Sequence, residues 1–254
     1  MIMFMRLVQV KVKDGQTEGL QHHYRQRIIV ALEGIPGCRY AGLMKSVHHP
    51  EECISLTLWD SEADAEAYER NGLFTTLLDE THPFLLESSE SRLQLSKDLT
   101  LEYVPIPEEP VVSSYPVSTR SDVPAPQQER RGPMWVRIVS LKLRPGRLEE
   151  FEELYREQVI PTLRNVKGCR YIYLAKRSGK MDEVLSVTSW ESKEDAENYE
   201  KSGLFARLLE SQQGTLSELY RWKLEEQKLQ GGLAATSEDP TVEHFDMLAG
   251  KAFK

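Results

Sequence analysis

Hydrophobic and polar residues alternate with a period of two in the first strand that the sequence predicts. The apolar residues Val8, Val10 and Val12 alternate with the mixed set Leu7, Gln9 and Lys11. This pattern is typical of a strand that packs one of its faces against helices. A helix follows, and strands are predicted near 38–46 and 52–59. A second helix begins at Ser61, whose Ser-x-x-Asp spacing is a variant of the capping box, and a last strand lies near 91–103. This order predicts a ferredoxin-like βαββαβ module, an antiparallel sheet with both helices on one face.

The same pattern occurs twice, because the chain matches itself at a shift of 131 residues. About 30 of 73 positions from Arg6 to Leu78 have the same residue in the second copy, and Gly37–Tyr40 recurs as Gly168–Tyr171. Two copies of this size indicate two domains rather than a solenoid. We predict a first module at 1–103, a linker at 104–133, a second module at 134–226 and a flexible tail at 227–254.

The linker and the tail are predicted to contribute little to the fold. Residues 104–133 hold seven of the 13 prolines and should be extended and partly ordered at best. The tail is polar and Gly-rich, with only a short possible helix from His244 to Leu248. The helices of each module cover only one face of its predicted sheet. The other module is the obvious partner to cover the second face. The chain is therefore expected to be a pseudo-dimer, with further oligomerisation left open.

Composition narrows the class of partner. The formal net charge of −8 disfavours nucleic acid and anionic membranes. No apolar run approaches the length of a membrane span, and the N-terminus lacks a signal-peptide pattern. Three cysteines without a C-x-x-C spacing suit a cytoplasmic protein with buried thiols. A small molecule or another protein remains as the partner.

Several motifs together resemble the antibiotic biosynthesis monooxygenase family. They are the βαββαβ order, a strand that ends at Trp59 before Ser61-x-x-Asp64-Ala65, the segment Gly72–Leu78, and the counterparts of all three in the second copy. The resemblance implies an α+β fold in which two ferredoxin-like modules pack sheet to sheet as a dimeric α/β barrel, here within one chain. It also implies a ligand pocket between sheet and helices. The family includes cofactor-independent monooxygenases of quinols and polyketide aromatics, haem-degrading monooxygenases and isomerase-like enzymes.

The haem-degrading alternative is disfavoured residue by residue. Such members carry an Asn in strand one, a Trp in helix two and an axial His ten residues later. The corresponding positions are Val8, Tyr68 and Leu78 in the first copy and Val139, Tyr199 and Leu209 in the second. Leucine cannot coordinate iron. His82 could share the helix face of Leu78, but Pro83 makes a helix there doubtful.

Candidate chemistry concentrates in the first copy. His23 aligns with Leu154 on an apolar helical stripe, so its ring is expected to face the sheet and to act as a general base. Tyr68 is expected at the pocket wall, as a second catalytic group. The leading interpretation is therefore a cofactor-independent monooxygenase of a small aromatic molecule, with its active pocket in the first copy.

The remaining candidates are wall or core residues. Expected substrate-binding positions are Tyr24, Trp59, Val8, Leu78, Tyr155 and Tyr199, each of which also suits ordinary core packing. We expect no metal site, since the adjacent His48 and His49 have no acidic partner at a characteristic spacing. No bound flavin or nicotinamide is expected, because no phosphate-binding glycine loop is present. No polar set is recognised in both pockets, which favours the competing class, a non-catalytic binding or assembly protein.

Overall fold

The computed structural model describes residues 3–95, 101–107, 110–122, 134–180, 182–218 and 241–253. These residues form two compact units, one around each repeat. The first-repeat unit comprises Arg6–Ser113 and Leu248–Lys254, and the second-repeat unit comprises Met1–Met5 and Ser114–Met247. A strand near each end of the chain therefore contributes residues to both units.

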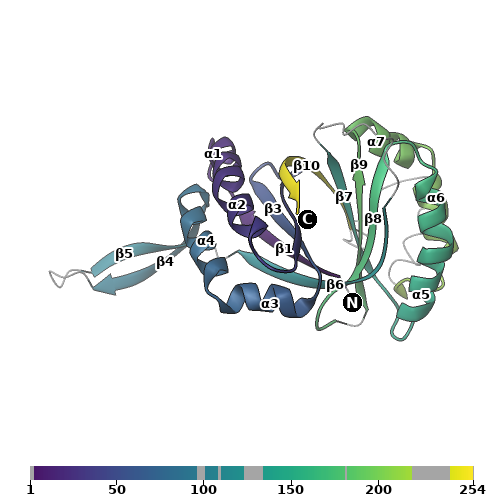
Figure 1. Ribbon diagram of the computed structural model, residues 1–254, viewed down its shortest axis with the longest axis horizontal. Coiled ribbons are helices and arrows are strands. Elements are labelled where there is room, and N and C mark those ends of the chain that lie inside the picture. The colour runs from purple at the N-terminus through teal and green to yellow at the C-terminus, as the bar shows by residue number, and fades with distance from the viewer. Residues whose placement is uncertain are drawn as a thin grey trace. The chain divides into compact units, whose positions relative to one another are not determined.

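The first-repeat unit contains the predicted strands and helices in order up to the last strand, and its helices lie together beside its strands (Figure 1). A turn of π-helix, η1, interrupts the first helix, and a short 3-10 helix, η2, follows the last one. The elements are β1 (Phe4–Lys11), α1 (Thr17–His23), η1 (Tyr24–Ile28), α2 (Ile29–Glu33), β2 (Cys38–Ser46), β3 (Glu52–Trp59), α3 (Glu62–Arg70), α4 (Leu73–Thr81), η2 (His82–Phe84), β4 (Glu87–Leu95) and β5 (Leu101–Pro107).

The second-repeat unit has the same helices and central strands, including the π-helical turn, here η3. Its elements are β6 (Val111–Asp122), β7 (Trp135–Lys142), α5 (Leu148–Leu154), η3 (Tyr155–Val159), α6 (Ile160–Arg164), β8 (Cys169–Lys176), β9 (Glu183–Trp190), α7 (Lys193–Lys201), α8 (Leu204–Ser211) and β10 (Thr241–Ala252).

The strand order confirms the predicted fold class. Antiparallel pairs join β2 to β3 and β8 to β9, and the hydrogen-bonded order β1-β3-β2-β10-β7-β9-β8-β6 closes as a barrel. The protein is thus an α+β chain of two ferredoxin-like modules that form one α/β barrel, as the sequence predicts.

The strands that complete each module differ from the prediction. The segment expected as the last strand of the first module forms β4 and β5, which pair with each other in a separate two-stranded sheet. Instead, β6 from the predicted linker pairs with β8, and the start of β10 pairs with β7. The expectations that the linker would be partly ordered at best, and that the tail would have at most a short helix at His244–Leu248, are therefore wrong where β6 and β10 form. In the second copy the sequence predicts the equivalent last strand near 217–226, a segment that lies mostly outside the described residues.

Local signals predicted from the sequence form as expected at the start of the second helix. The Ser61 hydroxyl accepts a hydrogen bond from the backbone N–H of Asp64 at 3.3 Å, and Ser192 does the same for Asp195 at 3.1 Å. Gly37 has a φ of +80°, and a Cβ there would lie 2.4 Å from the Asp64 carboxyl carbon. Only glycine fits such a position, which explains why the repeat also has glycine at 168.

Within the described residues, no helix has both the length and the apolar character needed to cross a membrane.

Candidate functional site

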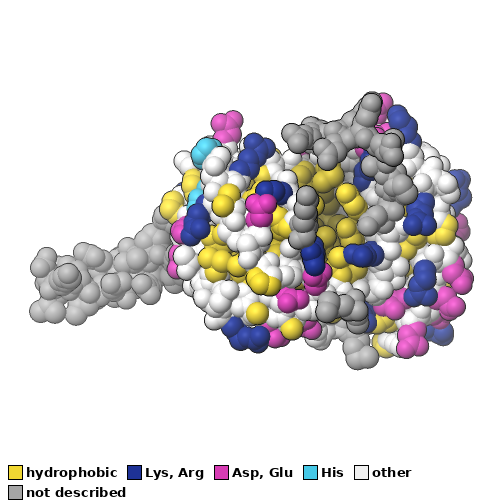
Figure 2. Space-filling view, viewed as in Figure 1, with side chains coloured by type: hydrophobic (Ala, Val, Ile, Leu, Met, Phe, Trp, Pro, Cys, Tyr) yellow, Lys and Arg dark blue, Asp and Glu magenta, His cyan; other side chains and the backbone are white. Residues whose placement is uncertain are grey.

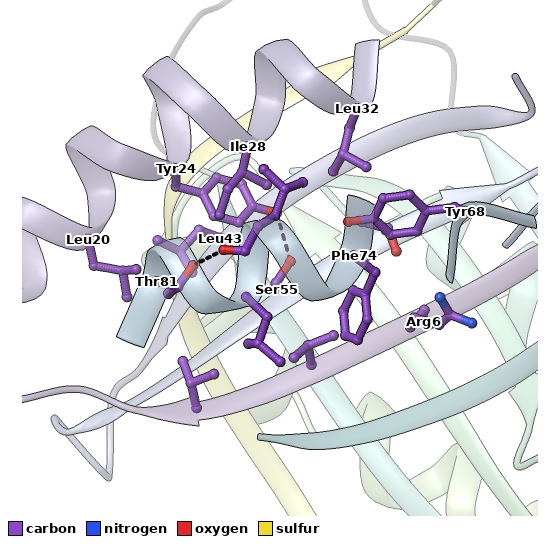
Figure 3. Close-up of a pocket in the computed structure, with 15 residues that line it drawn as sticks. Arg6, Leu20, Tyr24, Ile28, Leu32, Leu43, Ser55, Tyr68, Phe74 and Thr81 are labelled. Carbon is purple, nitrogen blue, oxygen red and sulfur yellow. Dashed lines mark hydrogen bonds between the residues drawn. The ribbon is translucent and has the colours of Figure 1, made fainter. Parts of the chain in front are cut away.

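A cavity of about 70 Å³ lies between the sheet and the helices of the first-repeat unit (Figure 3). Its walls come from β1, β2, β3 and every helix of the unit except η2. Nine lining residues are apolar: Val8, Val10, Leu20, Ile28, Leu32, Leu43, Phe74, Leu77 and Leu78. Six are polar or amphipathic: Arg6, Tyr24, Ser55, Thr57, Tyr68 and Thr81. Figure 2 shows hydrophobic side chains at the surface between the α1–α2 and α3–α4 helices, which supply much of this wall.

Most residues of the cavity wall recur in the second repeat. Eleven of the fifteen lining positions have the same residue in the second repeat, including the polar set Arg137, Tyr155, Ser186, Thr188 and Tyr199. The view that the repeats share no polar set is therefore wrong. The set was overlooked because its members are far apart in sequence and meet only when the module folds.

Four wall positions differ between the repeats, and three of the four carry a larger side chain in the second. Val10, Leu20 and Thr81 are replaced by Leu141, Phe151 and Gln212, whereas Ile28 is replaced by the smaller Val159. Phe151 is fully buried, and Gln212 is 3% exposed. The second repeat thus places more atoms where the first repeat has its cavity.

Tyr24 joins the first helix to the sheet across the cavity. Its hydroxyl lies 2.8 Å from Ser55 Oγ, and Tyr155 and Ser186 repeat the contact at 2.8 Å. Tyr24 also begins the π-helical turn η1, a distortion often found at functional sites. Burial raises the pKa of Tyr24, with the Ser55 hydrogen bond acting against it. The phenol therefore stays protonated near neutral pH.

Tyr68 lines the cavity, and its ring packs on Trp59. The two rings stack at 5.2 Å, and Phe74 packs edge-on against Tyr68 at 5.8 Å. The Trp59 indole N–H donates to Thr57 Oγ1 at 2.9 Å. Trp59 is fully buried and does not line the cavity, so it positions Tyr68 and Thr57 rather than contacting a ligand. Burial raises the pKa of Tyr68, and this phenol is also neutral.

The predicted residues of the second repeat keep the same surroundings. Tyr155 is fully buried beside Ser186, and Tyr199 stacks on Trp190 at 5.2 Å. Burial, opposed by the Arg137 charge, raises the pKa of Tyr199 to about 12. Both tyrosines therefore form part of the core of their own unit.

Arg6 is the charged residue of the cavity wall, and sequence reasoning missed it. The residue is 4% exposed. One terminal nitrogen donates to the Ala65 carbonyl at 3.3 Å, and the other lies 3.2 Å from a Glu69 carboxylate oxygen. The buried Nε has no hydrogen-bond partner among the described residues. The available signal was the duplication, which repeats the pair as Arg137 and Glu200.

The equivalent ion pair in the second repeat makes further contacts. Arg137 Nε donates to Glu200 at 2.6 Å, and His244 Nε2 lies 3.1 Å from the same carboxylate oxygen. The Arg137 guanidinium sits 4.0 Å from the centre of the Phe205 ring. Burial acts to raise the pKa of Glu200, but the hydrogen bonds and charges of His244 and Arg137 lower it to about 2.

His23 does not line the cavity, so the structure does not bring it together with Tyr68. Its ring packs against Phe84 at 5.4 Å, and the buried Nε2 has no partner among the described residues. Burial lowers the pKa of His23; Glu80 acts to raise it and Arg27 to lower it further. His23 is therefore neutral near neutral pH, but its position does not support direct contact with a ligand.

The structure also places the residues that were candidates for haem or metal binding. Val8 and Leu78 lie in the cavity wall, where histidine or asparagine would be needed for the haem chemistry. His82 begins η2, lies 3.7 Å from Asp79 and does not line the cavity. In the β2–β3 hairpin, His49 comes within 4.8 Å of Glu51 and Glu52, acidic neighbours that the spacing did not predict. His49 and Glu51 are exposed and Glu52 is half-buried, and nothing else in the described residues points to an ion there.

Comparison with known proteins identifies the repeats. The antibiotic biosynthesis monooxygenase family model matches residues 3–79 and 134–211, once in each repeat. No curated protein matches the chain.

Solved structures share the fold over nearly the whole chain. A candidate monooxygenase from Fusobacterium nucleatum is 8% identical with a TM-score of 0.67, covering 99% of this chain and 94% of its own. One from Lactobacillus acidophilus is 7% identical with a TM-score of 0.66, covering 99% and 97%. An anthrone oxidase-like protein is 13% identical with a TM-score of 0.53, covering 98% and 93%. At such identities the likeness shows the fold alone.

Proposed function

Because this chain belongs to the antibiotic biosynthesis monooxygenase family, we propose that its first repeat oxygenates a small aromatic molecule without a cofactor. The observation that carries the proposal is the cavity of the first-repeat unit. Its wall is mostly apolar, with a few polar groups at fixed places, which is the usual composition of a small-molecule site. An aromatic ring suits this wall better than a charged or strongly hydrated molecule.

The chemistry requires the substrate itself to reduce oxygen. A phenol or anthrone that loses a proton can pass an electron to O₂ and then form a carbon–oxygen bond. For an anthrone-like substrate, one oxygen atom replaces two hydrogens as a carbonyl and the other leaves as water, so no outside reductant is needed. The protein would bind the ring, exclude water and favour the deprotonated form.

Residue roles follow from position in the cavity. Tyr68 and Tyr24 keep their protons, because burial raises the pKa of both, so they would act as hydrogen-bonding groups rather than bases. The general-base role considered for His23 loses support, since His23 does not line the cavity. Any transfer of a proton to His23 would have to run through an intervening water.

A second function, non-catalytic binding of the same kind of molecule, is favoured by one observation. Histidine, the side chain that ordinarily titrates near neutral pH, is absent from the lining of this cavity. A binding protein needs no such group. The two functions therefore share a ligand and differ in oxygen consumption.

Oxygen uptake with a panel of quinols and anthrone-like phenols tests the proposal. We expect uptake with at least one compound, and a product that contains one oxygen atom from O₂ by mass spectrometry. Tyr68→Phe should lower turnover by roughly 10-fold, the loss of one hydrogen bond to the substrate, whereas the matched variant Tyr199→Phe should retain it. Binding of the compounds with no oxygen uptake would establish the binding function instead. Equal losses in both variants would contradict a single active pocket.

A further inference from the structure

The cavity wall holds a buried cation with one nitrogen that has no hydrogen-bond partner among the described residues. Arg6 is 4% exposed, and its Nε has no partner among the described residues, although both terminal nitrogens have one. Buried N–H groups are almost always paired in folded proteins. A guanidinium donor left unpaired in a cavity wall is therefore a place for an acceptor that is not part of the chain.

The second repeat shows the same arginine with that donor occupied. Arg137 uses its Nε for a 2.6 Å bond to Glu200, and its guanidinium lies 4.0 Å from the centre of the Phe205 ring. Arg6 has the looser contact, 3.2 Å to the more exposed Glu69. Among the described residues, no ring contact of this kind is formed by the Arg6 guanidinium. Both repeats have arginine, glutamate and phenylalanine at these positions, and each arginine has one buried nitrogen without a partner, Nε in Arg6 and a terminal nitrogen in Arg137. The repeats therefore differ in which nitrogen lacks a partner, and Arg6 lines the cavity.

The charge around Arg6 favours an anionic acceptor. Among the described residues, the acidic partner of Arg6 is Glu69, whose side chain is 40% exposed, so water screens part of its charge. Tyr68 and Tyr24 are neutral phenols. The guanidinium thus keeps much of its positive charge in the cavity wall, where the low dielectric strengthens its attraction for a negative oxygen.

The unpartnered nitrogen distinguishes between the two common aromatic anions. A carboxylate has two oxygens and about four acceptor positions to satisfy, whereas Nε is the one Arg6 nitrogen without a partner among the described residues. A phenolate has one oxygen and spreads its charge into the ring. We propose that the molecule in this cavity carries a ring hydroxyl bound as phenolate, whose oxygen accepts a hydrogen bond from Arg6 Nε.

This inference rests on the proposed ligand-binding role of the cavity, but not on oxygen chemistry. It makes Arg6 the residue that selects the deprotonated ligand. In the oxygenase, the same contact would hold the electron-rich form of the substrate that reacts with O₂.

Titration of bound para-nitrophenol tests the inference, because only its phenolate absorbs visible light. With the full-length protein, we expect the pKa of the bound probe to fall by about 1 to 3 units, the usual effect of an opposite charge at contact distance. Arg6→Met should abolish this shift and weaken phenolate binding roughly 10- to 100-fold. Nitrobenzene, which lacks the hydroxyl, should bind equally well to both proteins.

Two further variants control for folding. Arg137→Met removes a closer ion pair in the second repeat and should leave the pKa of the bound probe unchanged. Arg6→Lys keeps the charge and should keep part of the shift, even if Arg6→Met folds poorly.

The outcomes separate this inference from the proposed function. An unshifted or raised pKa in the wild-type protein would overturn the role of Arg6, as would an undiminished shift in Arg6→Met. A lowered pKa without oxygen uptake from any quinol would overturn the oxygenase activity and leave the phenolate contact standing. Failure of both nitrobenzene and para-nitrophenol to bind would overturn the ligand site as a whole.

Discussion

Replacing Leu20 with phenylalanine should close the cavity and abolish ligand binding. The second repeat has Phe151 at this position, fully buried within the same helix and sheet arrangement. The module therefore tolerates a phenyl ring there. Leu20 lines the cavity, so the added carbons of Leu20→Phe would enter the space that the ligand needs.

The effect on stability should be small because two terms oppose each other. At about 24 cal/mol per Å³, complete filling of a cavity of about 70 Å³ would add at most about 2 kcal/mol to the free energy of unfolding. Overpacking costs about 1 to 3 kcal/mol where neighbours must move. We therefore expect Tm to stay within about 5 °C of the wild type, while ligand affinity falls at least about 10-fold.

Calorimetric titration with nitrobenzene measures both the affinity and the number of sites. The reverse change supplies the matched variant: Phe151→Leu combined with Leu141→Val and Gln212→Thr should raise the stoichiometry from one to two ligands per chain. Removal of this packing should also destabilise the chain by about 2 to 4 kcal/mol. Full affinity in Leu20→Phe, or a single site in the triple variant, would refute the reasoning that wall size selects the active repeat.

Three more results are expected. His23→Leu should retain turnover within about threefold, because His23 does not line the cavity; a loss near 100-fold would restore it as a general base. Hemin titration should give no histidine-ligated Soret species, since Leu78 and Leu209 cannot bind iron; a complex that degrades with reductant would contradict this and direct attention to His82. Glu200→Gln should lower the free energy of unfolding by about 2 kcal/mol at pH 7. The pKa of Glu200 falls from 4.5 to about 2 on folding, so its contribution is full above about pH 4.5 and lost as the pH falls toward 2. Urea unfolding of both proteins at pH 7 and near pH 2 measures this, and an equal difference at both pH values would disprove it.

Local sequence signals predicted the helices and the first three strands of each repeat. Alternation in Val8–Val12 and the serine caps at 61 and 192 act between near neighbours, so they remain visible in the sequence. The completing strands were missed because their partners are far away: Thr241 pairs with Ser140, and Val117 with Ala175. Strand formation depends strongly on such pairing, and nothing local marks it.

A single helical distortion explains why Tyr24 lines the cavity and His23 does not. Leu20, Tyr24, Ile28 and Leu32 all line the cavity at a spacing of four residues. A regular helix of 3.6 residues per turn would carry that row away from the wall, but the π-helical turn at Tyr24–Ile28 keeps it aligned. His23 lies beside this row and packs against Phe84. The average helical period could not reveal the distortion.

The two repeats also separate what the module needs from what the ligand needs. The Tyr24–Ser55 contact and the Tyr68–Trp59 stack recur in the second repeat, where larger side chains occupy positions 141, 151 and 212. Recurrence there argues that both contacts serve the packing of the module, whatever else they do. Two features belong to the first repeat: the space left by Val10, Leu20 and Thr81, and the unpartnered Nε of Arg6. Ligand selectivity should therefore respond to changes at these four residues more than to changes in the shared tyrosines.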